Sequence, residues 1–123
     1  MGHDTIRRVT ALFASTDLLT QPKVWQPAVD VYRTQYGWLV KYEMAGVASE
    51  DVSLTVEGPR LTVRGLRRDL AVQHGCNHYR MEISYSSFTR TIELPENLER
   101  STLVTEFHNG MLLVRIEREM PHE

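Results

Sequence analysis

The chain contains 123 residues, of which 41% are apolar and 24% are charged. This length and composition fit one soluble domain with its own core, and they exclude the disordered and membrane classes. The net charge of −2 argues against nucleic acid as the main partner. The single cysteine, Cys76, cannot form a disulfide within the chain. We therefore expect a cytoplasmic protein, without a signal peptide or a membrane partner.

The first 24 residues are predicted to form an N-terminal arm that is either helical or disordered. Apolar residues between Thr5 and Leu19 stand near helical spacing, and Pro22 would end such a helix. Two roles stay open for this arm. It makes apolar contacts with unfolded proteins, or it is a frayed tail.

From Trp25 onward the apolar residues alternate with polar ones, which is typical of β-strands. The turn signals Gly58-Pro59 and Asn109-Gly110 separate neighbouring strands. The predicted strands cover residues 28–33, 38–44, 52–56, 61–64, 79–83, 88–94, 102–107 and 111–116. Seven or eight short strands with close turns predict an all-β, antiparallel, immunoglobulin-like β-sandwich over residues 25–118. Residues 119–123 are left as a short charged C-terminal stub.

The connection of residues 66–78 is long and polar, and it contains the cluster His74, Cys76 and His78. A zinc site there would need a fourth ligand and a rigid geometry, so we interpret the cluster as chance and predict no metal. A nucleophile elbow and a phosphate-binding P-loop are both absent from the sequence. We therefore predict no enzymatic activity and no cofactor.

Five sequence segments, taken together in their order and spacing, are typical of one protein family, although no single segment is specific to it. They are Trp25 to Tyr32; Met44 to Val47 with Glu50-Asp51-Val52; Leu61 to Gly65 with Arg67-Arg68; Phe88-Thr89-Arg90 with Leu94-Pro95; and Asn109 to Leu112. Together they resemble the α-crystallin domain of small heat shock proteins, from Trp25 to about Arg118. Two positions depart from the family pattern: Thr105 replaces the usual alanine, and Ala45 replaces the usual proline.

The resemblance implies an ATP-independent holdase chaperone, which binds partly unfolded client proteins and suppresses their aggregation under stress. It also implies a groove for clients or for a tail motif between strands 52–56 and 102–107. The residues expected to approach this groove are Val52, Leu54, Val56, Thr102 and Val104. Alternation alone does not distinguish them from ordinary core residues.

The resemblance further implies a homodimer, in which residues 79–83 cross to a partner and pair near residues 29–33. The expected interface residues are Val29, Val31, Tyr79, Met81, Ile83 and Arg90. An interfacial Arg90 would need acidic partners, whereas a surface one would contribute little. Family members commonly carry an I-x-I-type tail that builds higher oligomers. The tail is short here, so either the chain is truncated or the assemblies are small.

Two other functions stay open at this point. The first is a co-chaperone of the CS-domain class, which has a similar sandwich without strand exchange and is monomeric in gel filtration. The second is a carbohydrate-binding β-sandwich that uses Trp25, Trp38 and Tyr36 as a platform, because aromatic faces stack on sugars. Aromatic residues more often pack a core or an interface.

Overall fold

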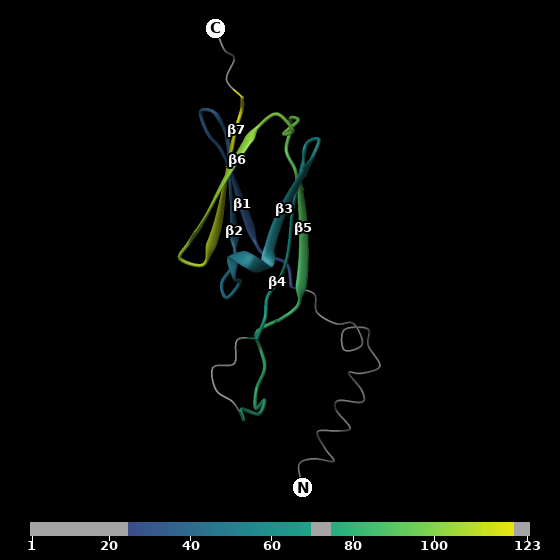
Figure 1. Ribbon diagram of the computed structural model, residues 1–123, viewed down its shortest axis with the longest axis vertical. Coiled ribbons are helices and arrows are strands. Elements are labelled where there is room, and N and C mark those ends of the chain that lie inside the picture. The colour runs from purple at the N-terminus through teal and green to yellow at the C-terminus, as the bar shows by residue number, and fades with distance from the viewer. Residues whose placement is uncertain (1–24, 70–74, 120–123) are drawn as a thin grey trace.

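The computed structural model describes residues 25–69 and 75–119 of the chain (Figure 1). Within these residues no helix has the length and apolar character that a membrane span requires. The predicted N-terminal arm of residues 1–24 lies outside the described residues, as do residues 120–123. The strands are β1 (Val29–Arg33), β2 (Gly37–Glu43), β3 (Val52–Glu57), β4 (Arg60–Leu66), β5 (Ser87–Glu93), β6 (Thr102–His108) and β7 (Met111–Glu117), with a 3₁₀ turn at Ser49–Asp51.

The strands form two antiparallel sheets that face each other (Figure 1). The first sheet has the order β1-β2-β7-β6, and the second has the order β3-β4-β5. Antiparallel neighbours need only short connections. Four pairs of hydrogen-bonded strands are consecutive in the chain, and in three of them (β1–β2, β3–β4 and β6–β7) the connection has two or three residues. The predicted antiparallel β-sandwich is therefore confirmed.

Both predicted turn signals form tight hairpins. Asn109 and Gly110 have φ angles of 49° and 76°, as a two-residue hairpin between β6 and β7 requires. Gly58 has a φ of 59° in the hairpin between β3 and β4. Asparagine and glycine tolerate this left-handed region better than other residues, so the turn chemistry is local and readable from the sequence.

The core lies between the sheets, on the inner face of each strand. Along β2, Trp38, Val40 and Tyr42 are buried and stand opposite the buried inner residues of β7. Leu61 and Val63 of β4 are fully buried on the facing sheet. The other buried apolar residues of this core are Met44, Phe88, Leu94, Leu98, Leu112, Val114 and Ile116.

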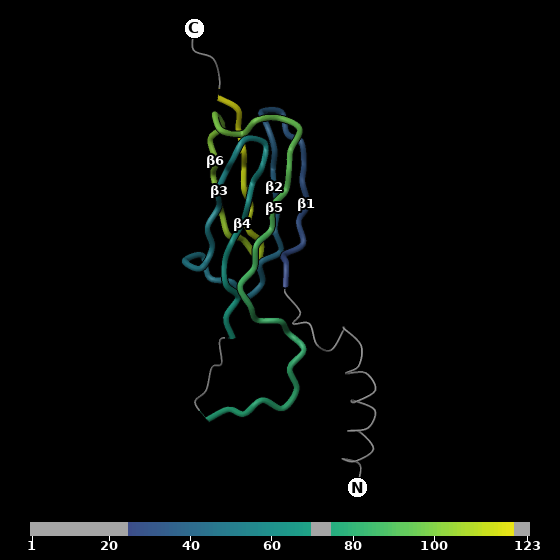
Figure 2. The backbone as a smooth tube through the Cα atoms, turned by 90° about the vertical axis from the view of Figure 1, so that its right-hand side faces the viewer, coloured from purple at the N-terminus to yellow at the C-terminus, as the bar shows by residue number. Residues whose placement is uncertain are grey.

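The segment between β4 and β5 leaves the sandwich at one end and returns there (Figure 2). The strand predicted over Tyr79–Ile83 does not form within this chain. The reason is physical: a strand needs a neighbour for its backbone hydrogen bonds, and this segment lies away from both sheets. The side chain of Tyr79 is 98% exposed. The other seven strand predictions are confirmed, with ends that differ by at most two residues.

Candidate functional site: an apolar groove and an open sheet edge

An open groove runs between the edge of one sheet at β3 and the edge of the other at β6. Its volume is about 510 Å³. The apolar lining residues come from β3, β6 and β7. The lining residues are Ser49, Val52, Leu54, Thr105, Glu106, Phe107 and Leu112. A segment with two or three apolar side chains fits such a groove.

Two of the predicted groove residues, Val52 and Leu54, line the groove from β3. Both are half-buried and pack against the core. Val56 lies on the same inner face of β3 and packs against the core, but it is not part of the groove wall. On β3, therefore, the strict alternation of the sequence identified the correct face.

On β6 the predicted face was wrong. Thr102 and Val104 pair with Glu117 and Arg115 of β7, whose side chains point to the outer face of the sheet. Val104 is 49% exposed there. A shift of one residue along a strand moves every side chain to the other face of the sheet. The prediction for β6 was displaced by one residue in this way.

The structure instead places Thr105 and Phe107 on the groove side of β6. These two residues stand opposite the buried Val114 and Leu112 of β7. A usable signal was present in the sequence. The Asn109-Gly110 turn fixes the register of the hairpin, so counting outward from it pairs Phe107 with Leu112.

The opposite side of the sandwich exposes the edge strand β1, which among the described residues pairs only with β2. Val29 is half-buried and packs against the core, while Val31 is 41% exposed although it stands opposite the buried Val40. An unpaired strand edge presents free backbone donors and acceptors to another chain. The predicted interface residues Met81 and Ile83 are exposed in the segment that leaves the sandwich.

Arg90 lies on the inner face of β5, opposite Val63, and is half-buried. Its Nη1 donates a hydrogen bond to the Pro27 carbonyl at 3.0 Å. Among the described residues it forms no ion pair with a carboxylate. The acidic partner expected for an interfacial arginine is therefore not supplied by the described part of its own chain.

Tyr42, on β2, is fully buried, and its hydroxyl has no hydrogen-bond partner among the described residues. Burial raises the pKa of this hydroxyl to about 12, because the phenolate would lose its hydration, and the charge of Arg90 partly opposes the rise. A buried hydroxyl without a hydrogen-bond partner destabilises the fold, so this end of β2 carries an unsatisfied polar group among the described residues.

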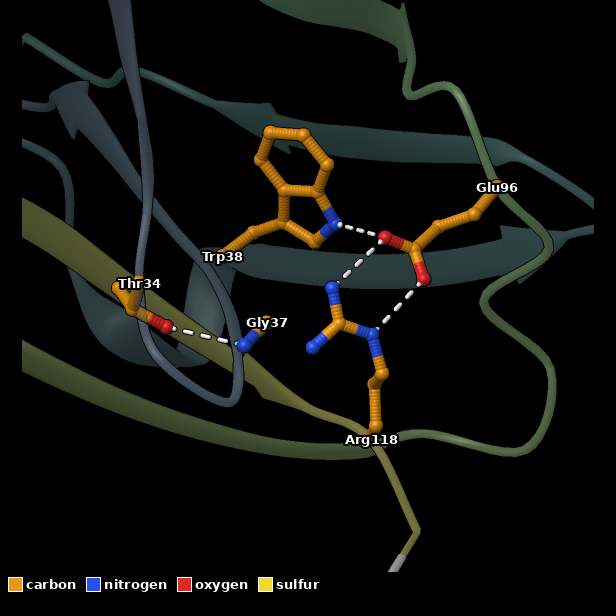
Figure 3. Close-up of polar contacts among 5 residues, drawn as sticks. All are labelled: Thr34, Gly37, Trp38, Glu96 and Arg118. Atoms are coloured by element: carbon orange, nitrogen blue, oxygen red, sulfur yellow. Dashed lines mark hydrogen bonds and ion pairs between the residues drawn. The ribbon is translucent and has the colours of Figure 1, made fainter.

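At its other end, β2 is tied to two further segments through Glu96 (Figure 3). The Trp38 indole N–H donates to Glu96 Oε1 at 3.0 Å, and the Arg118 guanidinium donates to both carboxylate oxygens at 3.1 and 3.2 Å. These bonds hold the pKa of Glu96 below its usual range, chiefly through Arg118 and then through Trp38.

The aromatic residues do not form the platform that a sugar-binding site would use. Trp38 is buried in the core, and its ring carries the Arg33 guanidinium at 4.3 Å. Trp25 packs edge-to-face on Phe88 at 5.0 Å. In the polar connection of residues 66–78, Cys76 and His78 are exposed, and His74 lies outside the described residues. Among the residues described, no three potential metal ligands are grouped.

The comparison with protein families identifies the chain. The model of the Hsp20/alpha crystallin family matches residues 30–123, which is most of the sequence. The chain belongs to this family. The resemblance inferred from the sequence segments is thereby confirmed, and the two facing sheets of this Hsp20-family chain are the family's sandwich.

Curated relatives and solved structures agree with this assignment. Small heat shock protein C2 of Rickettsia felis is 27% identical over 75% of this chain and 60% of its own length. Spore protein SP21 of Stigmatella aurantiaca is 28% identical over 79% of this chain and 57% of its own length. The structure of heat shock protein 16.0 from Schizosaccharomyces pombe superposes with a TM-score of 0.68 at 26% identity, covering 81% of this chain and 96% of that one. The Hsp20-family chain thus spans somewhat more than half the length of the two curated relatives.

Proposed function

We propose that this Hsp20-family chain is an ATP-independent holdase, which binds partly unfolded proteins and suppresses their aggregation under stress. The observation that carries the proposal is the apolar groove between β3 and β6, lined by Leu54 and Phe107. The names of the relatives, small heat shock and heat shock proteins, support it. We propose the cytoplasm as its compartment, because its only cysteine is free and exposed.

The size of the groove suggests weak and reversible holding. Each apolar side chain that it buries contributes about 1.5–3 kcal/mol. Two or three such side chains contribute about 3–9 kcal/mol, which is of the same order as the cost of association of about 4 kcal/mol or more. A single groove therefore releases its client readily, and firm holding needs several grooves on one assembly. Contact of this kind requires no nucleotide.

The proposal is tested with Leu54→Asp, which places a charge in the groove wall at a half-buried position beside the core. We expect suppression of heat-induced client aggregation, measured by light scattering without ATP, to require several-fold more of this variant than of the wild type. The matched control is Val104→Asp, which puts the same charge on the outer face of β6. It should protect clients as well as the wild type does.

Circular dichroism first establishes that both variants fold. If folded Leu54→Asp protects the client as efficiently as the wild type, the groove is not the client-binding surface and the proposal fails. If Val104→Asp loses protection to the same extent as Leu54→Asp, the effect comes from the added charge and not from the groove.

We also propose that two copies of the chain form a symmetric dimer by exchanging residues 79–83, which would pair with β1 of the partner. Three observations on residues 25–69 and 75–119 support this: β1 has an open edge, the side chains of Met81 and Ile83 are exposed, and the segment has no strand partner there. Higher oligomers built from such dimers follow as a further expectation. An interface would also supply the acidic partner for Arg90.

Deleting residues 70–84 should convert the dimer to a monomer, as measured by light scattering coupled to gel filtration. If the shortened chain is folded and still dimeric, strand exchange is wrong. A wild-type chain that is itself monomeric at every concentration would favour the CS-domain type of co-chaperone. The proposed partners are unfolded client proteins at the groove and a second copy of the chain at β1, and neither nucleic acid nor membrane is an expected partner.

A further inference from the structure

The main-chain pairing of β4 with β5 ends a few residues from the segment 79–83, which we propose is exchanged between two chains. The last paired residues are Leu66 and Ser87, followed by one hydrogen bond from the Arg67 N–H to the Ser86 carbonyl at 2.9 Å. Beyond this point the Arg67 side chain continues the connection, because its Nε donates to the Ser84 carbonyl at 2.8 Å. Arg67 thus holds the returning chain at Ser84, two residues beyond the last backbone hydrogen bond at Ser86.

The Arg67 guanidinium is braced from one side by an aromatic ring. Its central carbon lies 4.0 Å from the centre of the Trp25 ring, and Trp25 packs at 89° on Phe88. Space for Phe88 depends on Gly65, because a Cβ there would lie 2.6 Å from its ring carbon Cζ. A planar guanidinium stacks on a ring and still donates in its plane, which a lysine ammonium does not do.

The contacts of Arg67 differ from those of its neighbour Arg68. Arg68 forms two hydrogen bonds with the carboxylate of Asp51, at 2.9 and 3.1 Å, on the exposed side of the sheet. The polar contacts of Arg67 among the described residues are carbonyls, those of Ser84 and, at 3.5 Å, Ala45. Arg68 therefore forms a surface ion pair, whereas Arg67 fixes the position of a backbone segment.

Ser84 directly follows the exposed segment Tyr79–Ile83. We infer that Arg67, braced by Trp25, is a positioning residue for the association of two copies of this chain: it fixes the direction in which Tyr79–Ile83 leaves the sandwich. The inference rests on the proposed strand exchange. A segment with one end already fixed loses less conformational freedom on binding, and this lowers the cost of forming the dimer.

The test measures the dimer dissociation constant of the full-length chain by sedimentation equilibrium. Arg67→Ala should raise this constant about tenfold, since both the stack and the bond to Ser84 are lost. Arg67→Lys should recover only part of the loss, because it keeps the charge and not the planar fork. The matched control is Arg60→Ala, which removes the exposed arginine at the start of β4, where its Nε lies 3.5 Å from Glu93 Oε1. We expect it to dimerise within about twofold of the wild type.

Thermal unfolding of each variant separates positioning from a purely structural role. An Arg67→Ala variant that melts at a lower temperature but dimerises as tightly as Arg60→Ala overturns the inference, and it leaves strand exchange intact. If Arg67→Ala does not fold, Arg67→Lys carries the same comparison. A wild-type chain that never dimerises overturns both this inference and the proposed exchange. If the single variant Trp25→Leu also forms a weaker dimer, this result supports the role of the Trp25 ring in bracing Arg67.

Discussion

The two ends of the sandwich both combine a tryptophan with an arginine, but they do so differently. At the end where β2 begins, Trp38 and Arg118 share the carboxylate of Glu96, and the described polar groups of this cluster are paired (Figure 3). At the end where residues 75–83 leave, Arg67 stacks on Trp25, and its polar partners among the described residues are backbone carbonyls.

This difference distinguishes an end whose polar groups are paired within the chain from an end that we propose contacts a second chain. The Glu96 cluster joins β2, the β5–β6 connection and the residue after β7 into one closed unit within the chain. The opposite end keeps the Tyr42 hydroxyl without a partner and Arg90 without a carboxylate among the described residues. Arg90 is half-buried, so a carboxylate of a second chain can pair with it, whereas the Tyr42 hydroxyl is fully buried within its own chain. We therefore place the proposed dimer contact at that end.

The largest expected effect comes from Trp38→Ala compared with Trp25→Ala. Trp38 is 7% exposed in the core, so its truncation should lower the free energy of unfolding by about 3–5 kcal/mol. Trp25 is half-buried, and its truncation should cost about 1–2 kcal/mol. Urea denaturation measures both values, with the dimer diluted below its dissociation constant. Equal losses in the free energy of unfolding would show that the two ends contribute equally to the stability of the sandwich, and the proposed difference between the ends would be wrong.

A smaller effect is expected from Glu96→Gln, which should cost on the order of 1 kcal/mol at pH 7. Because the pKa of Glu96 is lower in the folded state, its ionised form stabilises the fold above the unfolded pKa, and this stabilisation is lost as the pH falls through the folded pKa. Urea midpoints at pH 7 and at acidic pH should therefore differ less in Glu96→Gln than in the wild type. Glu93→Gln, an exposed carboxylate on β5, is the control. An equal pH dependence in the wild type and Glu96→Gln would contradict the prediction.

The smallest expected effect, and one of opposite sign, comes from Tyr42→Phe. Removing a buried hydroxyl without a partner should leave stability unchanged or raise it by up to about 1 kcal/mol. Since the folded pKa of Tyr42 is raised to about 12, the wild type should also lose stability as the pH rises from about 10 toward 12, and Tyr42→Phe should lose less. A clear destabilisation of Tyr42→Phe at pH 7 would mean that the hydroxyl is hydrogen-bonded in the complete protein.

The interior of the strands and the turns could be predicted from the sequence, because both are decided by neighbouring residues. Alternation along 52–56 identified the inner face of β3, including Val52 and Leu54. The Asn109-Gly110 pair identified the β6–β7 hairpin, since few other residues adopt its left-handed angles. The same turn would have corrected the face of β6 if the register had been counted from it.

What the sequence alone determined is the order and type of the strands and the family's sandwich, because backbone periodicity and turn geometry act over a few residues. The tertiary structure decided which residues of β6 meet β3 and which arginines meet carboxylates, because these depend on how two sheets pack across long sequence separations. It also decided that Tyr79–Ile83 has no strand partner in the described part of its own chain, because backbone hydrogen bonds in a strand require a neighbour whose position no local pattern encodes.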